Sequence, residues 1–146
     1  TAVISLHACD IATDLALGTA IRAKAKYIAC VPCCHKELLD QYTMPGLEPL
    51  TKFGVFKARF NDVLTDSMRA LKLEAEGYKV SVVEYISPLD TPKNLLIRAT
   101  RTGKVNNRAK AEYDAVRRTL GTTSELDRRC AELDNEFFVT DEDLMG

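Results

Sequence analysis

Two stretches near the start of the chain, VISLHACD at residues 3–10 and YIACVPCCH at residues 27–35, decide the fold class. Residues 3–8 and 27–31 are mostly β-branched and small apolar residues, which is typical of strands buried on both faces of a parallel sheet. Pro32 has no N–H to donate to a neighbouring strand, so we expect it to end the second strand. The two stretches therefore predict a pair of buried strands.

A helix is predicted between these strands, over residues 14–26, with Asp10 or Thr13 as its N-cap. Its apolar positions recur at helical spacing and comprise Leu15, Ala16, Ala20 and Ala23. Strand, helix and strand together predict a right-handed βαβ unit. In such units the functional residues lie beyond the carboxyl ends of the strands.

The middle of the chain predicts a short helix near residues 36–41, an irregular excursion as far as Gly54, and then a long helix that ends at Gly77. The apolar side chains of the long helix form one stripe, which we expect to belong to the core: Phe56, Phe60, Val63, Leu64, Met68, Leu71 and Ala75.

Two further strands are predicted at residues 78–86 and 95–100. The connection between them is too short for a crossover helix, so we expect them to be antiparallel neighbours. Two amphipathic helices complete the chain, and Gly121 ends the first of them. Their apolar positions are Val105, Ala109, Tyr113, Val116 and Leu120 in the first, and Leu126, Cys130 and Leu133 in the second.

The composition is that of one folded domain. The 146 residues include 20 Lys+Arg and 21 Asp+Glu, for a net charge of −1, and 46% are hydrophobic, which excludes a disordered chain. The longest uncharged apolar-rich run, residues 27–34, falls well short of the roughly 20 residues that a membrane-spanning helix needs. No secretion signal is evident, so we expect a cytoplasmic protein whose five cysteines are reduced thiols.

The first strand starts almost at the first residue, and this suggests that part of the sheet is absent. A parallel strand buried on both faces needs neighbours, but residues 3–8 have one obvious parallel partner in this chain. We therefore expect the chain to be the C-terminal part of a longer doubly wound α/β domain. We also expect the isolated chain to associate with itself through the uncovered edge of this strand.

Three separated motifs, HACDIATD at residues 7–14, VPCCH at 31–35 and TPKNLLIR at 91–98, occur in order along the chain. They resemble the class I S-adenosylmethionine-dependent methyltransferases of the methyltransferase-like 25 and glutathione-S-transferase-C-terminal-domain-containing group, with their bacterial relatives. The resemblance covers roughly residues 1–103.

The resemblance implies a Rossmann-like, seven-stranded sheet whose last two strands form an antiparallel hairpin. The first motif would follow the fourth strand and the second motif the fifth. Residues 1–103 would then be the C-terminal part of a methyltransferase catalytic domain, 104–133 a helical extension and 134–146 a solvated acidic tail. The Gly-rich loop and the acidic residue that hold most of the cofactor in this fold would precede Thr1, so binding by this chain alone is expected to be weak or absent.

The same resemblance assigns site residues for S-adenosylmethionine and a methyl acceptor. Cofactor-binding positions are His7, Ala8, Cys9 and Asp14, catalytic positions are Asp10, Cys33, Cys34 and His35, and substrate-binding positions are Pro32, Lys93 and Asn94. Asp10 could accept a proton from a nitrogen or oxygen nucleophile. Simpler roles compete with these assignments, since His7 could be a core histidine and Asp10 or Asp14 a helix cap.

The cysteines allow three interpretations. Cys30, Cys33, Cys34 and His35 form CxxCCH, which could bind zinc together with His7 and Cys9, but Cys30 lies inside a strand and there is no second CxxC, so no metal is predicted. RNA cytosine-5 methyltransferases have a thiolate nucleophile after the fifth strand and a second cysteine after the fourth. Cys33 or Cys34 and Cys9 would occupy similar strand ends, so a thiolate nucleophile here is an analogy of position alone. Small side chains packed at a strand end are the simplest interpretation.

Two function classes remain open. The leading one is an enzyme that transfers a methyl group from S-adenosylmethionine to an unidentified acceptor, with RNA as a candidate. The alternative is a non-catalytic RNA- or protein-binding module derived from the same fold. It would use the basic stretch at residues 98–118, where seven Lys and Arg residues outnumber two acids.

Overall fold

The computed structural model describes residues 1–87, 89–91 and 93–136, with the backbone alone given for 133–136. The predicted acidic tail, apart from the backbone of residues 134–136, and the side chain of Leu133 therefore lie outside the described part. The elements in chain order are β1 (Ala2–Cys9), α1 (Ile11–Arg22), β2 (Tyr27–Cys34), the 3-10 helix η1 (Glu48–Thr51), α2 (Gly54–Ala75), β3 (Tyr78–Glu84), β4 (Leu95–Arg101), α3 (Asn107–Leu120) and α4 (Glu125–Glu136).

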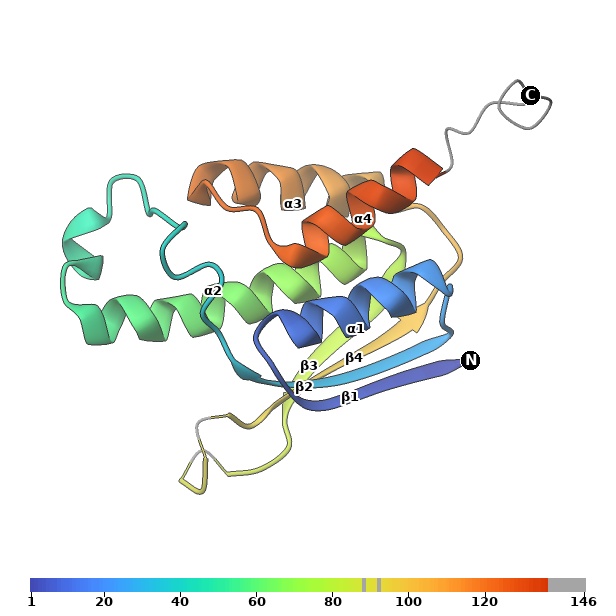
Figure 1. The fold of residues 1–146 in the computed structure, drawn as a ribbon, viewed down its shortest axis with the longest axis horizontal. Helices are drawn as coiled ribbons and strands as arrows, with labels where there is room; N and C mark the ends of the chain where they lie inside the picture. Colours follow the sequence, from blue (N-terminus) through green and yellow to red (C-terminus); the bar gives the residue numbers. More distant parts are fainter. Residues whose placement is uncertain (88, 92, 137–146) are drawn as a thin grey trace.

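The four strands form one mixed open sheet in the order β1-β2-β4-β3 (Figure 1). β1 and β2 are parallel and are joined through α1, as the βαβ prediction requires. β4 is antiparallel to both of its neighbours, β2 and β3. The predicted antiparallel pair is therefore confirmed, and β1 is an edge strand that pairs with β2 alone among the described strands.

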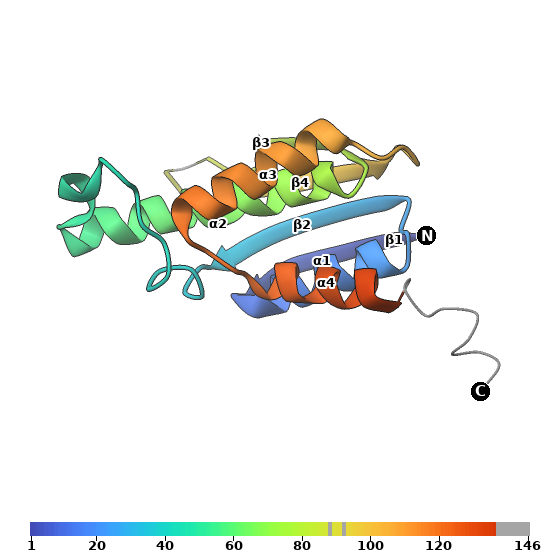
Figure 2. The same ribbon diagram turned by 90° about the horizontal axis from the view of Figure 1, so that it is seen from above.

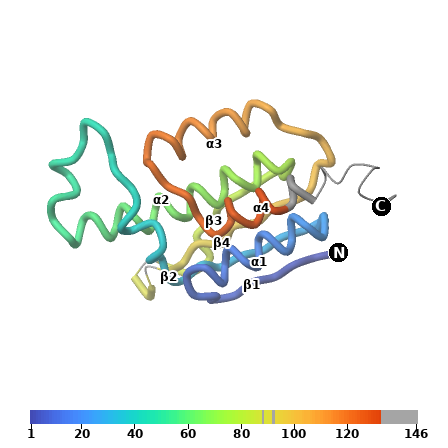
Figure 3. Tube along the Cα trace, turned by 45° about the horizontal axis from the view of Figure 1, so that its top comes forward, coloured from blue at the N-terminus to red at the C-terminus, as the bar shows by residue number. Residues whose placement is uncertain are grey.

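The helices lie on one face of this sheet, with α1 and α2 against the strands and α3 and α4 farther out (Figures 1 and 2). α3 packs on α2 and α4 packs on α1, and the tube in Figure 3 shows the two pairs side by side. Buried residues from β2, β4, β3, α1, α2 and α4 form the main core: Leu17, Ala20, Ala25, Ile28, Cys30, Leu73, Tyr78, Ile97, Ala99, Leu126 and Cys130.

The opposite face of the sheet has no helix among the described residues. Ile4 and Leu6 on β1 point to this face and are 69% and 63% exposed, although their sequence is that of a doubly buried strand. These two apolar side chains are therefore uncovered by the described residues on this face of the sheet. No helix within the described residues combines the length and apolar character that crossing a membrane requires.

β2 does not end at Pro32, contrary to the prediction. The strand continues to Cys34, because the pairing of β2 with β4 stops at Cys30 and the register with β1 shifts around Ala8, which lies opposite Pro32. A proline at such an irregularity costs the sheet no regular N–H bond.

The apolar stripe of α2 is buried only in its second half, so the prediction that the whole stripe belongs to the core is wrong. Met68 and Ala75 are buried, but α2 extends well past the sheet (Figure 1), and Phe56 and Val63 in its first half are 54% and 64% exposed. The predicted short helix at residues 36–41 is a series of turns, α1 begins at Ile11, and Val105 precedes α3 and is exposed.

Candidate functional site

The parallel pairing of β1 and β2 brings the first two sequence motifs together where the carboxyl ends of these strands meet. Cys9 lies opposite Cys34 in the register, so His7–Asp10 and Pro32–His35 leave the sheet side by side. The connection between β3 and β4 leaves the sheet at this same edge (Figure 1). In open α/β sheets this is the edge at which ligands bind.

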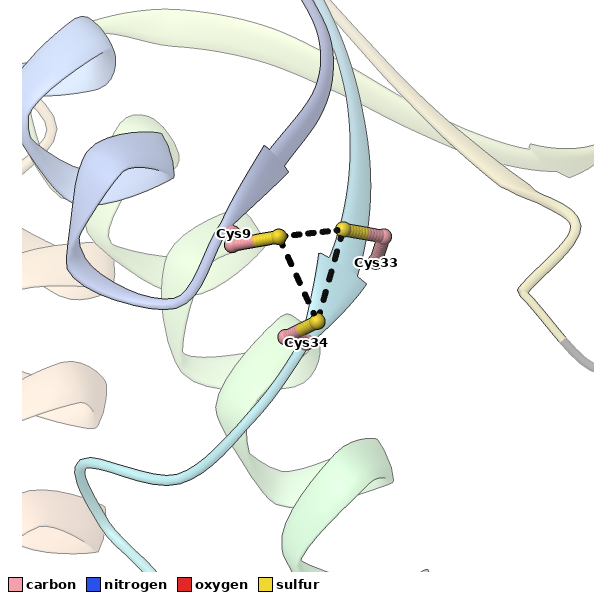
Figure 4. A group of neighbouring side chains, drawn as sticks. All are labelled: Cys9, Cys33 and Cys34. Carbon is pink, nitrogen blue, oxygen red and sulfur yellow. Dashed lines mark hydrogen bonds between the residues drawn. The ribbon is translucent and has the colours of Figure 1, made fainter.

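Three thiols meet at the ends of these strands (Figure 4). The Sγ atom of Cys9 lies 3.4 Å from that of Cys33 and 3.5 Å from that of Cys34, and the two vicinal sulfurs are 3.6 Å apart. The Cys33 thiol is also 3.4 Å from the backbone oxygen of His7, to which it donates. We call Cys9, Cys33 and Cys34 the thiol cluster.

The contacts among these thiols shift the pKa values of Cys9 and Cys33 in opposite directions. Hydrogen bonds from Cys33 and Cys34 lower the pKa of Cys9, which is exposed. Desolvation and the neighbouring sulfurs raise the pKa of Cys33 to about 12. Cys30 stands apart from the cluster on the helix-facing side of β2, where burial raises its pKa to about 12. Within the cluster, Cys9 therefore ionises more readily than Cys33.

His35 turns away from the thiol cluster into a polar network formed with α2. Its Nε2 atom is 2.8 Å from Asp66 Oδ1, and its Nδ1 atom is 3.3 Å from the Lys93 ammonium. The same Nδ1 atom also lies 3.3 Å from Asp62 Oδ1, so the imidazole lies between the carboxylates of Asp62 and Asp66. Lys93 also binds Asp62 at 2.9 Å.

Arg69 continues this network toward α1 and is almost completely buried. Its Nε atom donates to Asp14 at 2.7 Å, Nη1 to Asp66 at 3.2 Å and Nη2 to the backbone oxygen of Asp10 at 3.0 Å. Burial alone would lower the pKa of Arg69, but the Asp14 and Asp66 carboxylates outweigh it and raise the pKa. Arg69 therefore stays charged and ties α2 to the start of α1.

Neither aspartate of the first motif caps α1 with its side chain. Asp10 occupies the N-cap position, but its Oδ1 accepts from the backbone N–H groups of Lys36 and Glu37 and so fixes the loop that follows β2. Asp14 accepts from Arg69 and from the N–H of Leu126, which ties α4 to the site. Both residues were predicted as site residues or caps. In the structure, Asp10 instead holds the loop after β2, and Asp14 holds Arg69 and the start of α4.

The backbone at the end of β1 is strained. His7 and Asp10 have φ values of 52° and 48°, a left-handed conformation that costs a residue with a side chain of order 1–3 kcal/mol. Thr13 secures this segment by donating from Oγ1 to the oxygen of Ala8 at 2.7 Å. Strain held in place by such contacts is typical of functional sites.

A small pocket of about 100 Å³ lies between β2, α2 and the β3–β4 connection. It is lined by Pro32, His35, Asp62, Val63, Asp66, Lys93 and Leu95. Asn94 is buried beside it and donates its amide to the oxygen of Ile86 at 2.8 Å, which closes the connection on itself. The pocket is much smaller than the roughly 300–1,000 Å³ of a typical small-molecule site.

The structure thus places eight of the predicted site residues at the strand ends, and His35, Lys93 and Asp14 in the polar network with α2. Asp62, Asp66 and Arg69 were missed. A signal for them exists, because the polar residues Asn61, Asp62, Thr65, Asp66 and Arg69 follow helical spacing on α2, and four of the five are buried. A polar stripe on the buried side of a helix indicates a network of this kind.

Comparisons with known proteins agree with these observations at a coarse level. A family model described as a methyltransferase domain matches residues 1–41, which span β1, α1 and β2, and the match supports a methyltransferase-like function. No solved structure matches the chain significantly.

Among curated proteins, the human glutathione S-transferase C-terminal domain-containing protein is 28% identical over 119 residues. That match covers 64% of this chain and 19% of the human protein. The Drosophila melanogaster homolog is 28% identical over 122 residues, which cover 64% of this chain and 21% of that protein. The chain spans about a fifth of the length of these relatives.

Proposed function

We propose that this chain is the C-terminal part of the catalytic domain of an S-adenosylmethionine-dependent methyltransferase, which methylates a nitrogen or oxygen atom of its acceptor. The observation that carries this proposal is the meeting of His7–Asp10 and Pro32–His35 at the carboxyl edge of two parallel strands. Both segments fall within residues 1–41, the part that the methyltransferase model matches.

The sheet supports the assignment of the strands. If β1 and β2 are the fourth and fifth strands of a seven-stranded sheet, β3 and β4 are the final antiparallel hairpin, which is what the resemblance to class I methyltransferases implies. β1 would then pair on its free side with a strand from an earlier part of the protein. The exposed Ile4 and Leu6 would be covered by helices from that same part.

The residues at the strand ends fit the reacting end of such a cofactor, and not the whole of it. The pocket lined by Pro32 and His35, at the carboxyl end of β2, is about 100 Å³, which is too small for a whole cofactor molecule. We therefore propose that earlier residues hold the adenosine and methionine moieties, and that the isolated chain is inactive.

The residues at the strand ends would then take separate roles in methyl transfer. When bound, the cofactor would supply an electrophilic methyl group on a positively charged sulfur. His7, Ala8 and Cys9 would border the methyl group, and Asp10 would accept the proton that the acceptor loses. The two N–H groups of Lys36 and Glu37 hold the Asp10 carboxylate in one orientation, while Pro32, Lys93 and Asn94 would contact the acceptor.

Transfer of a tritiated methyl group tests this proposal. The full-length protein is incubated with labelled cofactor and, separately, with cellular RNA and with cellular protein. We expect label in one acceptor class, and we expect Asp10→Asn to reduce the rate by about 100-fold, within the range for general-base groups. Asp40→Asn, a change to an exposed acid in the turns after β2, is the matched control and should keep the wild-type rate.

The alternative of a non-catalytic RNA-binding module finds less support in the basic stretch. Arg98 alternates with the buried Ile97 and Ala99 and so points to the helix-free face of the sheet, whereas α3 lies on the helical side (Figure 1). Arg108 on α3 is paired with Glu112. The seven basic residues thus do not share one surface. A full-length protein that binds RNA without transferring label would favour this alternative.

A further inference from the structure

We propose that the thiol cluster, Cys9, Cys33 and Cys34, binds one zinc ion through three thiolates, with a fourth coordination position open to solvent. This proposal does not rest on the proposed methyltransferase function. It also differs from the zinc site considered from sequence, since Cys30 and His35, two of the residues in that pattern, point elsewhere.

The distances among the three sulfurs match the geometry that zinc requires. Tetrahedral zinc with Zn–S bonds of about 2.3 Å places its thiolate sulfurs about 3.8 Å from one another. The sulfurs of the cluster are 3.4, 3.5 and 3.6 Å apart. Each sulfur would need to move by only a few tenths of an ångström to surround an ion, so the folded chain largely preorganises the site.

The backbone is distorted in the way that such a site needs. Consecutive side chains of a regular strand point to opposite faces, so the vicinal Cys33 and Cys34 should not both face Cys9. They do so here (Figure 4), at the point where the register of β1 and β2 shifts on both sides of Ala8 and where His7 has a φ of 52°.

The donor set favours zinc over harder ions. Thiolate ligands select zinc and other soft ions over magnesium or calcium, and the thiol cluster is the one group of three or more potential metal ligands found within the described residues. Cys9 is exposed and lies at the open edge of the sheet. Three protein ligands and one open position are the arrangement of catalytic zinc sites, in which water or substrate takes the fourth place.

Metal analysis and titration of the reduced protein under anaerobic conditions test the proposal. We expect the purified chain to bind one Zn²⁺ per molecule, and Cd²⁺ to give the ultraviolet charge-transfer absorption of cadmium–thiolate bonds. Cys9→Ser should weaken Zn²⁺ binding by more than the 10–100-fold typical of a residue that contacts a metal ligand. Replacing all three cysteines with serine should abolish the cadmium–thiolate absorption.

Two controls make the result decisive. Cys130→Ala removes a thiol outside the cluster and should leave Zn²⁺ stoichiometry and affinity unchanged. Cys9 is exposed, so Cys9→Ser should keep the thermal unfolding transition of the parent chain, and any loss of binding is then not due to unfolding. Equal Zn²⁺ affinity in Cys9→Ser and Cys130→Ala, or no stoichiometric binding by the reduced parent chain, would overturn the proposal.

Discussion

Replacing Arg69 with methionine should destabilise the chain more than any surface change. Its guanidinium bonds Asp14 at 2.7 Å and Asp66 at 3.2 Å, and the exposed fractions of these two aspartates are 2% and 7%. Methionine fills a similar volume but leaves two buried carboxylates without their cation. Removing one partner of a buried pair costs roughly 3–5 kcal/mol, a large share of the 5–15 kcal/mol that stabilises a typical domain.

Urea unfolding followed by circular dichroism measures this loss. With a slope of about 2 kcal/mol per molar urea, a loss of about 4 kcal/mol lowers the midpoint by about 2 M. Arg108→Met is the matched control, since the Arg108–Glu112 pair lies on the surface, and should change the free energy of unfolding by less than about 0.5 kcal/mol.

A double-mutant cycle with Asp14→Asn identifies the partner through which Arg69 acts. Because the two side chains share one ion pair, we expect the double variant to lose less stability than the two single variants together, by at least about 1 kcal/mol. A loss below about 1 kcal/mol for Arg69→Met, or strict additivity in the cycle, would refute the inference that this ion pair joins α2 to α1.

Three further outcomes are expected. Val63→Ala, at an exposed position of the α2 stripe, should cost less than about 0.5 kcal/mol in urea unfolding, whereas Met68→Ala, at a buried position of the same stripe, should cost about 2–5 kcal/mol; similar losses would show that the whole stripe is core. Light scattering should show that the isolated chain self-associates and that Ile4→Lys reduces this association, so a monodisperse parent chain would contradict the open-edge argument. Iodoacetamide should modify Cys9 before Cys30, and because the pKa of Cys9 is lowered, its reaction should persist as pH falls below the ordinary thiol pKa; first modification at Cys30 would contradict the thiol geometry.

Local patterns were sufficient to predict much of the fold. The apolar stretches around Val3 and Ile28 gave the parallel pair, and the short connection before Leu95 required an antiparallel hairpin; both are confirmed. The prediction that Pro32 ends β2 was wrong, because it assumed regular hydrogen bonding along the strand. The register with β1 shifts at this point, and the sequence around Pro32 alone does not reveal that shift. The extent of α2 past the sheet could not be deduced from its stripe, since the stripe carries no information on where the sheet ends.

The candidate site was predictable where it follows strand ends and not where it depends on packing between distant helices. The meeting of Cys9 with Cys34 follows from the parallel pairing of β1 and β2. The positions of His35 and Asp14 do not, because their partners, Asp66 and Arg69, lie on α2, 31 and 55 residues farther along the chain. Only the position of α2 relative to α1 and to the end of β2 in the folded chain decides those contacts.

Calorimetric titration with S-adenosylhomocysteine tests the central claim most directly. The product lacks the transferable methyl group, so binding is measured without turnover. We expect the full-length protein to bind one molecule per chain, and the isolated 146-residue chain to bind at least about 100-fold more weakly, because most of the contacts would come from earlier residues. A full-length, folded protein that binds neither S-adenosylhomocysteine nor S-adenosylmethionine would contradict the account.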